Sequence, residues 1–484
     1  MSSILRVRNA EKEIFMRVLS LFQLTAGFSS PIGENPIFGL LQLNMGVVKF
    51  PVCEVLFDQP LFSSLDELKR LEIARGMLED ANLSFEERRF PDVKSIYLKA
   101  LPAWETIIED KGLTAKISSL PPYQRKFSSG YLYTKVMERG LEALERLDEK
   151  SDAINGYMQL LEQTTYVPHH RGDWFNRLTI LLIRVDKRLD AAAKLLLRGI
   201  RDHLVRPQHR LELCDRLRRI SNRLTAPTRK QITCQETSWT VREPVVVEIR
   251  GKLCPTEQSG RSGFHVMFMQ QDSASRVEEL ALTHYLEAGF SQGVHAEGSL
   301  FTSLFGLLCW DIIYEQPIAN VFRSKYQTAP LDLTCPTFHT SRKTAIEAKI
   351  ETITGQSIAD SAAACLAVWN EQNGVHTPVV SWDLLPSCEY LSGLLHCFQP
   401  RQLARIVHRY ANDFAAVRAG FPDLTLWNPV TKALKVVEVK GPNDRLSHKQ
   451  SIWIDFLMDI GVDVEVCHVV ASGAKRKSSV LEDV

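Results

Sequence analysis

An acidic residue and a lysine lie two positions apart near the end of the chain, in the sequence VEVKG. They are Glu438 and Lys440, and Asp423 precedes them in FPDLTLW. Because side chains alternate along a strand, Glu438 and Lys440 would share one face while Val437 and Val439 point to the other. Carboxylate oxygens hold Mg²⁺ or Mn²⁺, and a nearby cation stabilises an attacking water or developing charge. This set suits the hydrolysis of a phosphodiester.

A hairpin and a helix are expected to position these residues. Leu424 to Trp427 and Leu434 to Lys440 read as two strands on either side of a turn at Asn428 and Pro429. Strands and helices alternate throughout this part of the chain, which favours a mixed α/β domain. Helices are also predicted at residues 276–289, 299–314, 341–352 and 447–460, and further strands at 241–249, 264–269 and 462–470.

The first half of the chain has the apolar periodicity of α-helices. From Leu65 to Leu83 apolar residues recur at helical spacing, and Ser64 provides an N-cap. Paired helices in series predict a helical-repeat array with a concave face for a partner, although no strict period is found. A boundary is expected at Thr225 to Gln231, which contains Pro227. Similar helices are predicted at residues 90–104, 131–147, 151–161, 174–188, 189–203 and 209–220.

Charge is distributed unevenly along the 484 residues. The net charge is +1, yet residues 171–230 contain sixteen Lys or Arg against six Asp or Glu. This basic segment on a mildly acidic body suggests an anionic partner. The hydrophobic fraction of 45% and charged fraction of 24% exclude a largely disordered chain.

The positions of the cysteines and the lengths of the apolar runs argue against further classes of protein. The ten cysteines are dispersed without a C-x-x-C pair, which argues against a finger-type zinc site and a disulfide framework. The N-terminus is not a signal peptide, and the longest apolar stretch, Leu304 to Ile313, is too short to span a membrane and contains Asp311. We expect an intracellular, soluble chain.

A D…E-x-K pattern alone is weak, because Glu438 and Lys440 could simply face solvent while Asp423 caps a turn. The surrounding sequence, GFPD followed by VEVKGPNDRLSHKQ, resembles the VRR-NUC family of PD-(D/E)xK nucleases. The chain is most similar to the Fanconi-anaemia-associated nuclease branch of that family. The resemblance extends to VEELALTHYLEAGFSQGVHAEGSLFTSLFGLLCWDIIYE (277–315), VFRSKYQTAPLDL (321–333) and FHTSRK (338–343), and more weakly to RGDWFNRL (171–178) and GLLQLNMGVVKFP (39–51).

The resemblance implies an α + α/β fold, in which a helical, TPR-like N-terminal part precedes a restriction-endonuclease-like α/β VRR-NUC domain. Residues 61–231 would form the helical repeat-like domain, basic from residue 171. Residues 232–484 would form the nuclease domain, with its core motifs in 277–470. Longer family members begin with a ubiquitin-binding zinc finger and a SAP-type DNA-binding module. We expect this chain to start after the finger, with at most the tail of a SAP-like module in residues 1–60.

The resemblance assigns catalytic and metal-binding roles residue by residue. Asp423, Glu438 and the main-chain carbonyl of Val439 match the family's metal ligands, and Lys440 matches its catalytic lysine. Glu297, in VHAEG, matches a further acidic element among the catalytic and metal-binding residues. From the sequence alone, Glu297 would instead be a favourable charge at a helix N-terminus. The implied cofactor is Mg²⁺ or Mn²⁺, as one or two ions.

The resemblance also implies a set of DNA-binding residues. Three of them, Arg177, His209 and Lys449, are expected to form a pocket for the DNA 5′-phosphate where the two domains meet. The family often has an arginine eight residues before the metal-binding aspartate, and Ala415 stands there in this chain with Arg418 nearby. The alternative for the arginines of the basic segment is a merely solvated helix face. The DNA-binding candidates are Arg177, His209, Arg210, Arg418, Asp444, Arg445 and Lys449.

The implied function is a structure-specific, metal-dependent DNA nuclease of interstrand cross-link repair in the nucleus. It would be a 5′-flap endonuclease with 5′-to-3′ exonuclease activity. Its partner would be branched or flapped duplex DNA with 5′ ends, bound by a monomer or a dimer, with repair-complex proteins recruited through regions outside this chain and no membrane. The alternatives are a Holliday-junction-type VRR-NUC resolvase and a non-catalytic DNA-binding scaffold. The intact Glu297, Asp423, Glu438 and Lys440 argue against the scaffold.

Overall fold

The computed structural model describes residues 11–15, 17–18, 21, 41–42, 44–185, 187–233, 241–253, 268–270, 273–442 and 444–471. The chain divides into two compact units. The helical unit comprises residues 57–240 and 334–337, and the sheet unit comprises 1–56, 241–333 and 338–484. Most of the SAP-like tail predicted within residues 1–60 falls outside the described residues.

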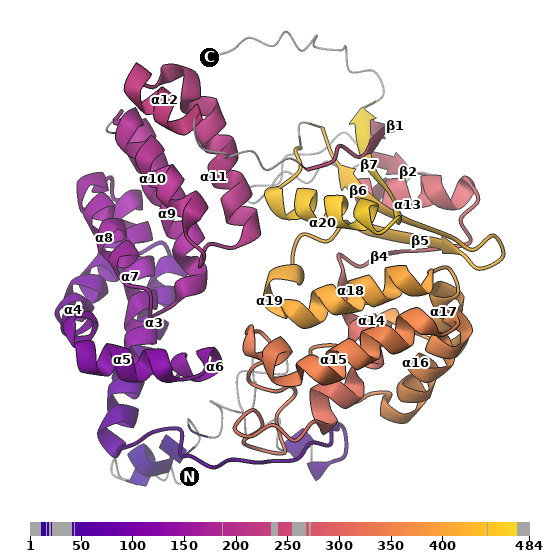
Figure 1. Ribbon diagram of the computed structural model, residues 1–484, viewed down its shortest axis with the longest axis horizontal. Helices are drawn as coiled ribbons and strands as arrows, with labels where there is room; N and C mark the ends of the chain where they lie inside the picture. Colours follow the sequence, from indigo (N-terminus) through magenta and orange to yellow (C-terminus); the bar gives the residue numbers. More distant parts are fainter. Residues whose placement is uncertain are drawn as a thin grey trace, which may run out of the picture. The chain divides into compact units, whose positions relative to one another are not determined.

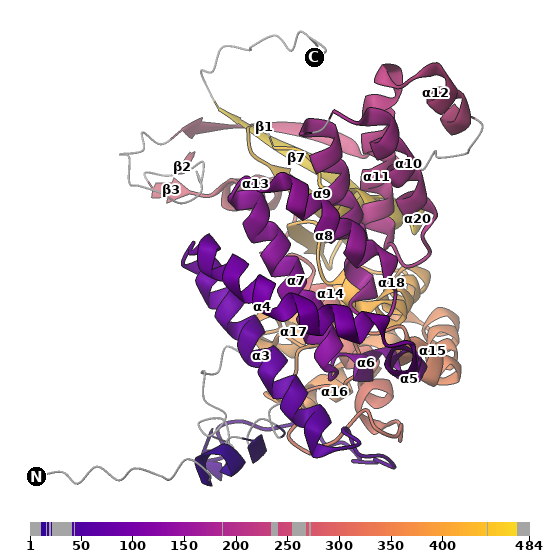
Figure 2. The ribbon, with the colours of Figure 1, turned by 90° about the vertical axis from the view of Figure 1, so that its left-hand side faces the viewer.

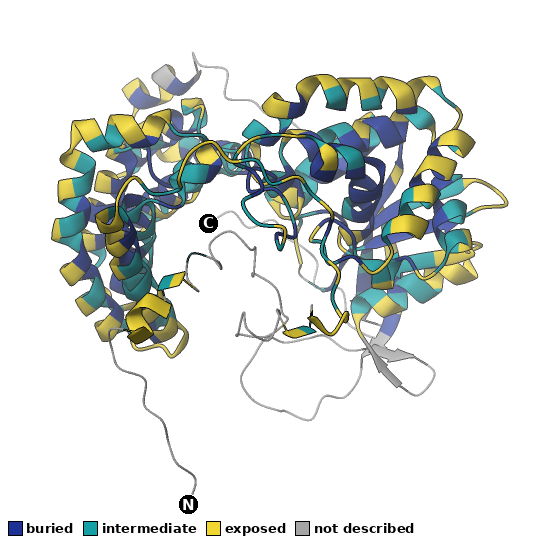
Figure 3. Cartoon of the chain, turned by 90° about the horizontal axis from the view of Figure 1, so that it is seen from below, coloured by how far each residue is buried: buried dark blue, intermediate teal, exposed yellow. Residues whose placement is uncertain are grey.

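The helical unit is built from packed α-helices (Figure 2), in which α7 packs on both α3 and α4, and α9 on both α10 and α11. Its interior contains large aromatic side chains, among them Trp104, Trp174 and Phe175. Along each helix buried and exposed residues alternate with the helical period (Figure 3). The helices are α3 (Leu65–Glu86), α4 (Phe90–Glu109), α5 (Lys111–Ser119), α6 (Pro122–Arg125), α7 (Ser129–Arg146), α8 (Lys150–Glu162), α9 (Arg171–Arg184), α10 (Leu189–Arg201), α11 (Pro207–Ile220) and α12 (Ala226–Thr233), with 3-10 turns at Pro168–His170 and Ser221–Arg223.

Local sequence signals explain where these helices begin. The Ser64 hydroxyl accepts a hydrogen bond from the Glu67 amide at 3.2 Å, as the predicted N-cap of α3 requires. A domain boundary is predicted at Thr225 to Gln231. In the structure, residues from Ala226 onward instead form helix α12. Pro227 is compatible with this helix since the first turn needs no backbone N–H donor there.

Within the described residues of the sheet unit, seven strands form a sheet in the order β3-β2-β1-β7-β6-β5-β4. β1, β7 and β6 are parallel, and the other neighbouring pairs are antiparallel. The predicted hairpin is confirmed as β5 and β6, with Leu424 opposite Val437. The strands are β1 (Val245–Leu253), β2 (Phe268–Gln270), β3 (Ser273–Ser275), β4 (Gln292–His295), β5 (Leu424–Asn428), β6 (Ala433–Lys440) and β7 (Asp463–Ala471).

In the view of Figure 1, a group of helices lies below the strands: α14, α15, α16, α17 and α18. α13 packs on the sheet through Ala281 and Tyr285, which share a core with Val437 and Val439. The helices are α13 (Val277–Glu287), α14 (Ser299–Leu308), α15 (Thr337–Gly355), α16 (Ile358–Gln372), α17 (Cys388–Leu395), α18 (Pro400–Asn412), α19 (Phe414–Val417) and α20 (His448–Asp459). A π-helical turn covers Asp311–Glu315 and a 3-10 turn covers Trp382–Leu384.

A buried ion pair connects two of the upstream motifs of the sheet unit. Arg342, in FHTSRK, donates to Asp332, in TAPLDL, at 2.7 Å, and both side chains are fully buried. The Arg342 guanidinium also donates to the Ile312 carbonyl at 3.1 Å. These motifs therefore hold the helical layer together rather than contribute to the site described below.

The predicted fold class, a helical part followed by a mixed α/β domain, is confirmed. One detail differs from the sequence analysis. The single helix expected over residues 299–314 is α14, which ends at Leu308, followed by the separate π-helical turn. No described helix is long and apolar enough to cross a membrane.

Candidate metal-binding and catalytic site

β6 presents the acid and the lysine on the same face of the sheet. Val437 and Val439 belong to the core shared with α13, so Glu438 and Lys440 lie on the opposite face, as strand alternation predicts. Glu438 is 0% exposed and Lys440 8% exposed. The Lys440 Nζ lies 2.7 Å from the Glu438 Oε1. The alternative of two solvent-facing strand residues is therefore wrong.

Asp423 lies directly before β5 and is bound to the end of β6. Its Oδ2 accepts a hydrogen bond from the Val439 amide at 2.8 Å. Its main-chain carbonyl accepts a bond from the Ala296 amide at 3.2 Å, just after β4. Adjacent strands thus bring Asp423 and the segment after β4 to the same edge of the site.

The turn after β4 carries Glu297, whose backbone is left-handed with φ 43°. Gly298 follows with φ 85°, a conformation that glycine adopts without strain. Ligand atoms of His295, Glu297 and Asp423 lie within 4.8 Å of one another. The structure thus adds His295 to the sequence-derived set. The H-x-E spacing of His295 and Glu297 is the only local signal for this ligand, and a single histidine on a strand is too common to indicate a metal site.

Gln450 is a further site residue that the sequence analysis did not select. Its amide nitrogen Nε2 donates to the Glu438 Oε1 at 2.5 Å, and its Oε1 accepts from the Lys440 Nζ at 3.3 Å. The same Oε1 accepts from the Ser447 amide at 2.8 Å, which completes the capping box of α20. One side chain therefore joins the start of α20 to both residues of the E-x-K pair.

Electrostatics distinguish this site from an ordinary ion pair. Burial raises the pKa of Glu438 to about 8, and the nearby Asp423 carboxylate adds to the rise, while Lys440 opposes it. Burial also raises the pKa of Asp423, against the effect of its bond from the Val439 amide. The Glu438 Oε2 is buried and has no hydrogen-bond partner among the described residues. An orphaned carboxylate oxygen beside a second carboxylate fits a divalent cation.

Comparison with known proteins identifies the family of this chain. The family described as VRR-NUC domain matches residues 356–471, and the one described as Fanconi-associated nuclease 1, TPR domain, matches residues 67–221, which together cover more than half of the chain. Fanconi-associated nuclease 1 from Ailuropoda melanoleuca is 37% identical and that from Homo sapiens 36% identical, each over 98% of this chain and 47% of the relative. The chain belongs to the Fanconi-associated nuclease 1 family.

The chain spans about half the length of these curated Fanconi-associated nuclease 1 relatives. Its fold is also that of a solved family member, paFAN1, bound to DNA with a 2-nucleotide 5′ flap and a gap. The TM-score is 0.67 at 21% identity, over 95% of this chain and 72% of the solved one. The structure with a 1-nucleotide flap gives a TM-score of 0.63 over 98% of this chain and 80% of the solved one.

The loop after β6 and the first turn of α20 carry three of the predicted DNA-binding residues, all exposed: Asp444, Arg445 and Lys449. The Asp444 Oδ2 accepts from the Gly441 amide at 3.2 Å, so this carboxylate shapes the loop. Lys449 packs against Gly420, whose φ of 84° and lack of a Cβ permit the close approach. Arg418 is exposed, 5.9 Å from the Phe414 ring centroid.

The other predicted DNA-binding residues belong to the helical unit and are partly engaged there. Arg177 pairs with Glu145, its Nε donating at 3.1 Å, and the bond raises the pKa of Arg177. The Arg210 Nη2 donates to the main-chain carbonyls of Asp202 and Val205, each at 3.2 Å, which is a structural use of this arginine. His209 packs against Gly172. Because Lys449 lies in the sheet unit, the three-residue 5′-phosphate pocket stays a prediction.

Gln450→Leu is expected to lower the cleavage rate on the order of ten- to hundredfold. The variant loses hydrogen bonds to two charged groups, each worth about 1.5–3 kcal/mol, so Lys440 and Glu438 are no longer held. The measurement is single-turnover cleavage together with metal affinity by calorimetry. Ser447→Ala is the matched control, because it removes the α20 cap and keeps Gln450. Equal rates for the two variants would assign Gln450 to the cap alone.

Proposed function

We propose that this chain is a structure-specific DNA nuclease that hydrolyses phosphodiester bonds with a divalent metal ion. The observation that carries the proposal is the buried Glu438, with one unpartnered oxygen and the other bound to Lys440, beside Asp423. Family membership supports the nuclease class. The 5′-flap DNA in the solved paFAN1 structures supports 5′-flapped duplexes as the substrate.

The finer parts of the proposal follow the family resemblance. The chain would be a 5′-flap endonuclease with 5′-to-3′ exonuclease activity that acts in interstrand cross-link repair, and this role would require it in the nucleus. It would bind DNA as a monomer or as a dimer, and repair proteins would recruit it through regions outside this chain. The DNA contacts would come from Arg177, His209, Arg210, Arg418, Asp444, Arg445 and Lys449.

The donor set fits a hard divalent ion, Mg²⁺ or Mn²⁺. The carboxylates of Glu297, Asp423 and Glu438 and the main-chain carbonyl of Val439 would hold one or two such ions. His295 would add a nitrogen donor beside Glu297. When bound, the ion would supply Lewis-acid stabilisation of the attacked phosphate and lower the pKa of a water.

The chain's own residues would orient the DNA and stabilise the negative charge that develops at the attacked phosphate. Lys440, fixed between Glu438 and Gln450, would keep its positive charge beside the attacked phosphate and stabilise the negative charge that develops there. Arg445, exposed in the loop after β6, and Lys449, exposed in the first turn of α20, would hold neighbouring phosphates. Asp423, bound to the Val439 amide, would keep the ends of β5 and β6 in register at the site.

Metal affinity is expected to rise with pH up to about pH 8. The pKa of Glu438 is raised from 4.5 to about 8, so the metal-free protein holds a proton that must leave when the carboxylate binds an ion. Affinity for Mn²⁺ should therefore increase up to about tenfold per pH unit below pH 8 and then level off. Calorimetry in two buffers of different ionisation enthalpy measures the released proton. A flat profile from pH 6 to 8 would contradict it.

The same shift has a consequence for stability, since the folded-state pKa of Glu438 lies above its ordinary value. The native metal-free protein binds this proton more tightly than the unfolded chain does. Its stabilising contribution is therefore complete below about pH 4.5 and is lost as the pH rises through about 8.

Substrate choice tests the proposed function. The purified chain is incubated with a 5′-flap duplex, a 3′-flap duplex and a four-way junction, each labelled at either end, with Mg²⁺ or Mn²⁺. The proposal predicts incision near the 5′-flap junction and stepwise loss of nucleotides from recessed 5′ ends. Symmetric cuts in the four-way junction alone would favour the resolvase. Binding without cleavage of any substrate would favour the scaffold.

A 5′-phosphate on a one-nucleotide flap is expected to speed cleavage about ten- to hundredfold over a 5′-hydroxyl. This figure assumes one charge-assisted hydrogen bond, worth about 1.5–3 kcal/mol, from Arg177 in the transition state. Arg177→Ala should abolish the preference, which should also weaken as salt rises. Arg70→Ala, an exposed arginine of α3, is the control. Equal cleavage rates of the 5′-phosphate and 5′-hydroxyl flaps by the unmutated chain would contradict the predicted 5′-phosphate pocket.

A further inference from the structure

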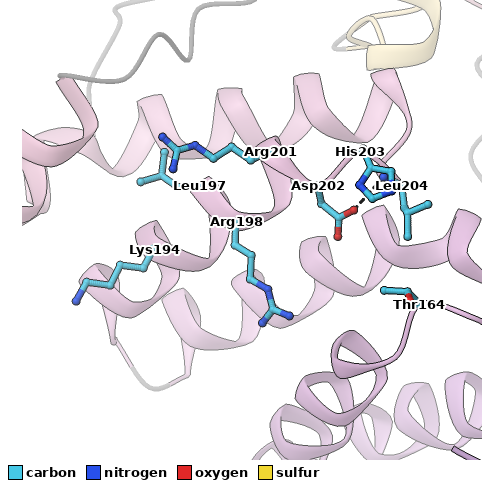
Figure 4. Close-up of a pocket in the computed structure, with 8 residues that line it drawn as sticks. All are labelled: Thr164, Lys194, Leu197, Arg198, Arg201, Asp202, His203 and Leu204. Carbon is cyan, nitrogen blue, oxygen red and sulfur yellow. Dashed lines mark hydrogen bonds between the residues drawn. The ribbon is translucent and has the colours of Figure 1, made fainter. Parts of the chain in front are cut away.

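A basic pocket lies on the helical unit, along α10. Lys194, Arg198 and Arg201 are spaced four and three residues apart, so they share one face of this helix. Figure 4 shows the three along α10, with His203 and Leu204 in the loop that follows. The pocket has a volume of about 530 Å³ and shares no residue with the candidate site of the sheet unit. Its lining residues are Thr164, Lys194, Leu197, Arg198, Arg201, Asp202, His203 and Leu204.

The positive charge of this pocket is little neutralised. Lys194 and Arg201 are exposed, and neither forms a salt bridge with an acidic residue among the described parts of the chain. Among the described residues, the Arg198 guanidinium contacts the Leu161 carbonyl through Nη2 at 3.2 Å and the exposed Glu162 through Nη1 at 3.4 Å. A bound anion would therefore compete with few internal partners.

The one acidic residue that lines the pocket, Asp202, already accepts hydrogen bonds from other residues of the helical unit. The Asp202 Oδ2 accepts from the Nη2 of the buried Arg171 at 2.7 Å, and its Oδ1 accepts from the Leu204 amide at 2.9 Å. Arg210 fixes the same loop through the Asp202 and Val205 carbonyls. These bonds leave the pocket with a net positive charge and hold the loop beside Arg201 in place.

The opposite face of α10 is fixed to the core. Ala192, Ala193 and Leu196 are fully buried, and α10 packs against α9 and α11. The three cations are thus presented by a rigid helix, spaced about 10 Å from first to last at 1.5 Å per residue. A strand of duplex DNA carries a phosphate every 3.4 Å of helix axis, so this row can meet two or more phosphates.

We propose that this pocket binds the phosphodiester backbone of nucleic acid without reading its sequence. The proposal rests on the proposed DNA nuclease function, and it assigns a DNA contact to residues of α10 that no match to the family motifs selected. The excess of ten positive charges in residues 171–230 favours a polyanion over a short acidic peptide. The lining offers cationic donors suited to phosphates, and no Asn or Gln amide that would pair with base edges.

The test measures the salt dependence of DNA binding for the full chain. Every protein carries Glu438→Ala, and the probe is a fluorescent 5′-flap duplex titrated at several KCl concentrations. The test variant is Lys194→Ala with Arg201→Ala, and the matched control is Lys69→Ala with Arg70→Ala, an exposed pair on α3. The test variant should reduce the slope of log K against log salt by about 1 to 2, since each phosphate contact contributes about 0.9. The control slope should equal that of the parent.

Each possible result of this test either supports or overturns the proposal. Equal slopes for the test variant, the control and the parent would overturn the proposal. A polyglutamate peptide whose binding depends on Lys194 and Arg201, with unchanged DNA slopes, would reassign the pocket to acidic proteins. Thermal melting checks that all variants fold alike. Cleavage by the chain with Glu438 intact is scored separately, so a failure to cut would count against the nuclease while leaving a slope change as support for the pocket.

Discussion

Glu438→Ala is expected to lower the cleavage rate on the order of a thousandfold or more while DNA binding persists. The buried Glu438 would supply a carboxylate to the metal, whose electrostatic contribution amounts to several kcal/mol of transition-state stabilisation. DNA affinity in the absence of metal should change little, because Glu438 is buried and holds a proton below about pH 8. Asp423→Ala should behave in the same way. The measurement combines single-turnover cleavage with fluorescence anisotropy.

The matched control for this loss is Glu465→Ala. Glu465 is also a buried glutamate of the central sheet, and it pairs with Lys435 at 2.9 Å away from the candidate site. Its removal should lower the free energy of unfolding and leave the cleavage rate of the folded protein near that of the parent. A normal cleavage rate for Glu438→Ala, with Glu465→Ala equally active, would refute the site assignment.

Lys440→Ala is expected to lower the cleavage rate on the order of a hundred- to thousandfold, as does the loss of one group that stabilises developing charge. Metal affinity should change little, because the lysine is not a ligand. Lys440 lowers the pKa of Glu438, so its removal raises that pKa further, and metal affinity is compared at the high-pH plateau of each protein. Lys435→Ala, from the same strand, is the control. A large loss of metal affinity with an unchanged maximal rate would contradict the catalytic role.

How much of the fold and of the candidate site can be predicted from the sequence depends on how far apart the interacting residues lie along the chain. Strand alternation placed Glu438 and Lys440 together, because that pattern is local and the two residues lie on one strand. The hairpin that brings Asp423 to the end of β6 was also predictable, since the turn and both strands are contiguous. The family motifs then supplied Glu297, which the structure places beside Asp423.

Contacts between remote segments were not predictable in the same way. The capping box of Ser447 and Gln450 could be read from the sequence, but the contact of Gln450 with Glu438 depends on how α20 packs on the sheet. Arg177 and Glu145 lie 32 residues apart, and nothing local indicates that an arginine expected to hold phosphate is bound to an acid.

The helices between residues 358 and 412 show the same limit. α16 buries only Ser361, Ala362 and Cys365, so its apolar stripe is weak and the periodicity gives little signal. α18, by contrast, buries seven residues on one side, and its amphipathic pattern could have been recognised from the sequence. Of these two helices, only α16 therefore lacks a clear signal in the sequence.

The central claim is that phosphodiester hydrolysis depends on a metal held by Glu438 and its neighbours. The most direct test removes metal from the chain with EDTA and then titrates Mn²⁺ or Mg²⁺ back during single-turnover cleavage of a labelled 5′-flap duplex, with Glu438→Gln in parallel. The predicted result is no cleavage in EDTA, saturable recovery with either ion, and no recovery in Glu438→Gln. Cleavage that survives EDTA, or full recovery in Glu438→Gln, would contradict it.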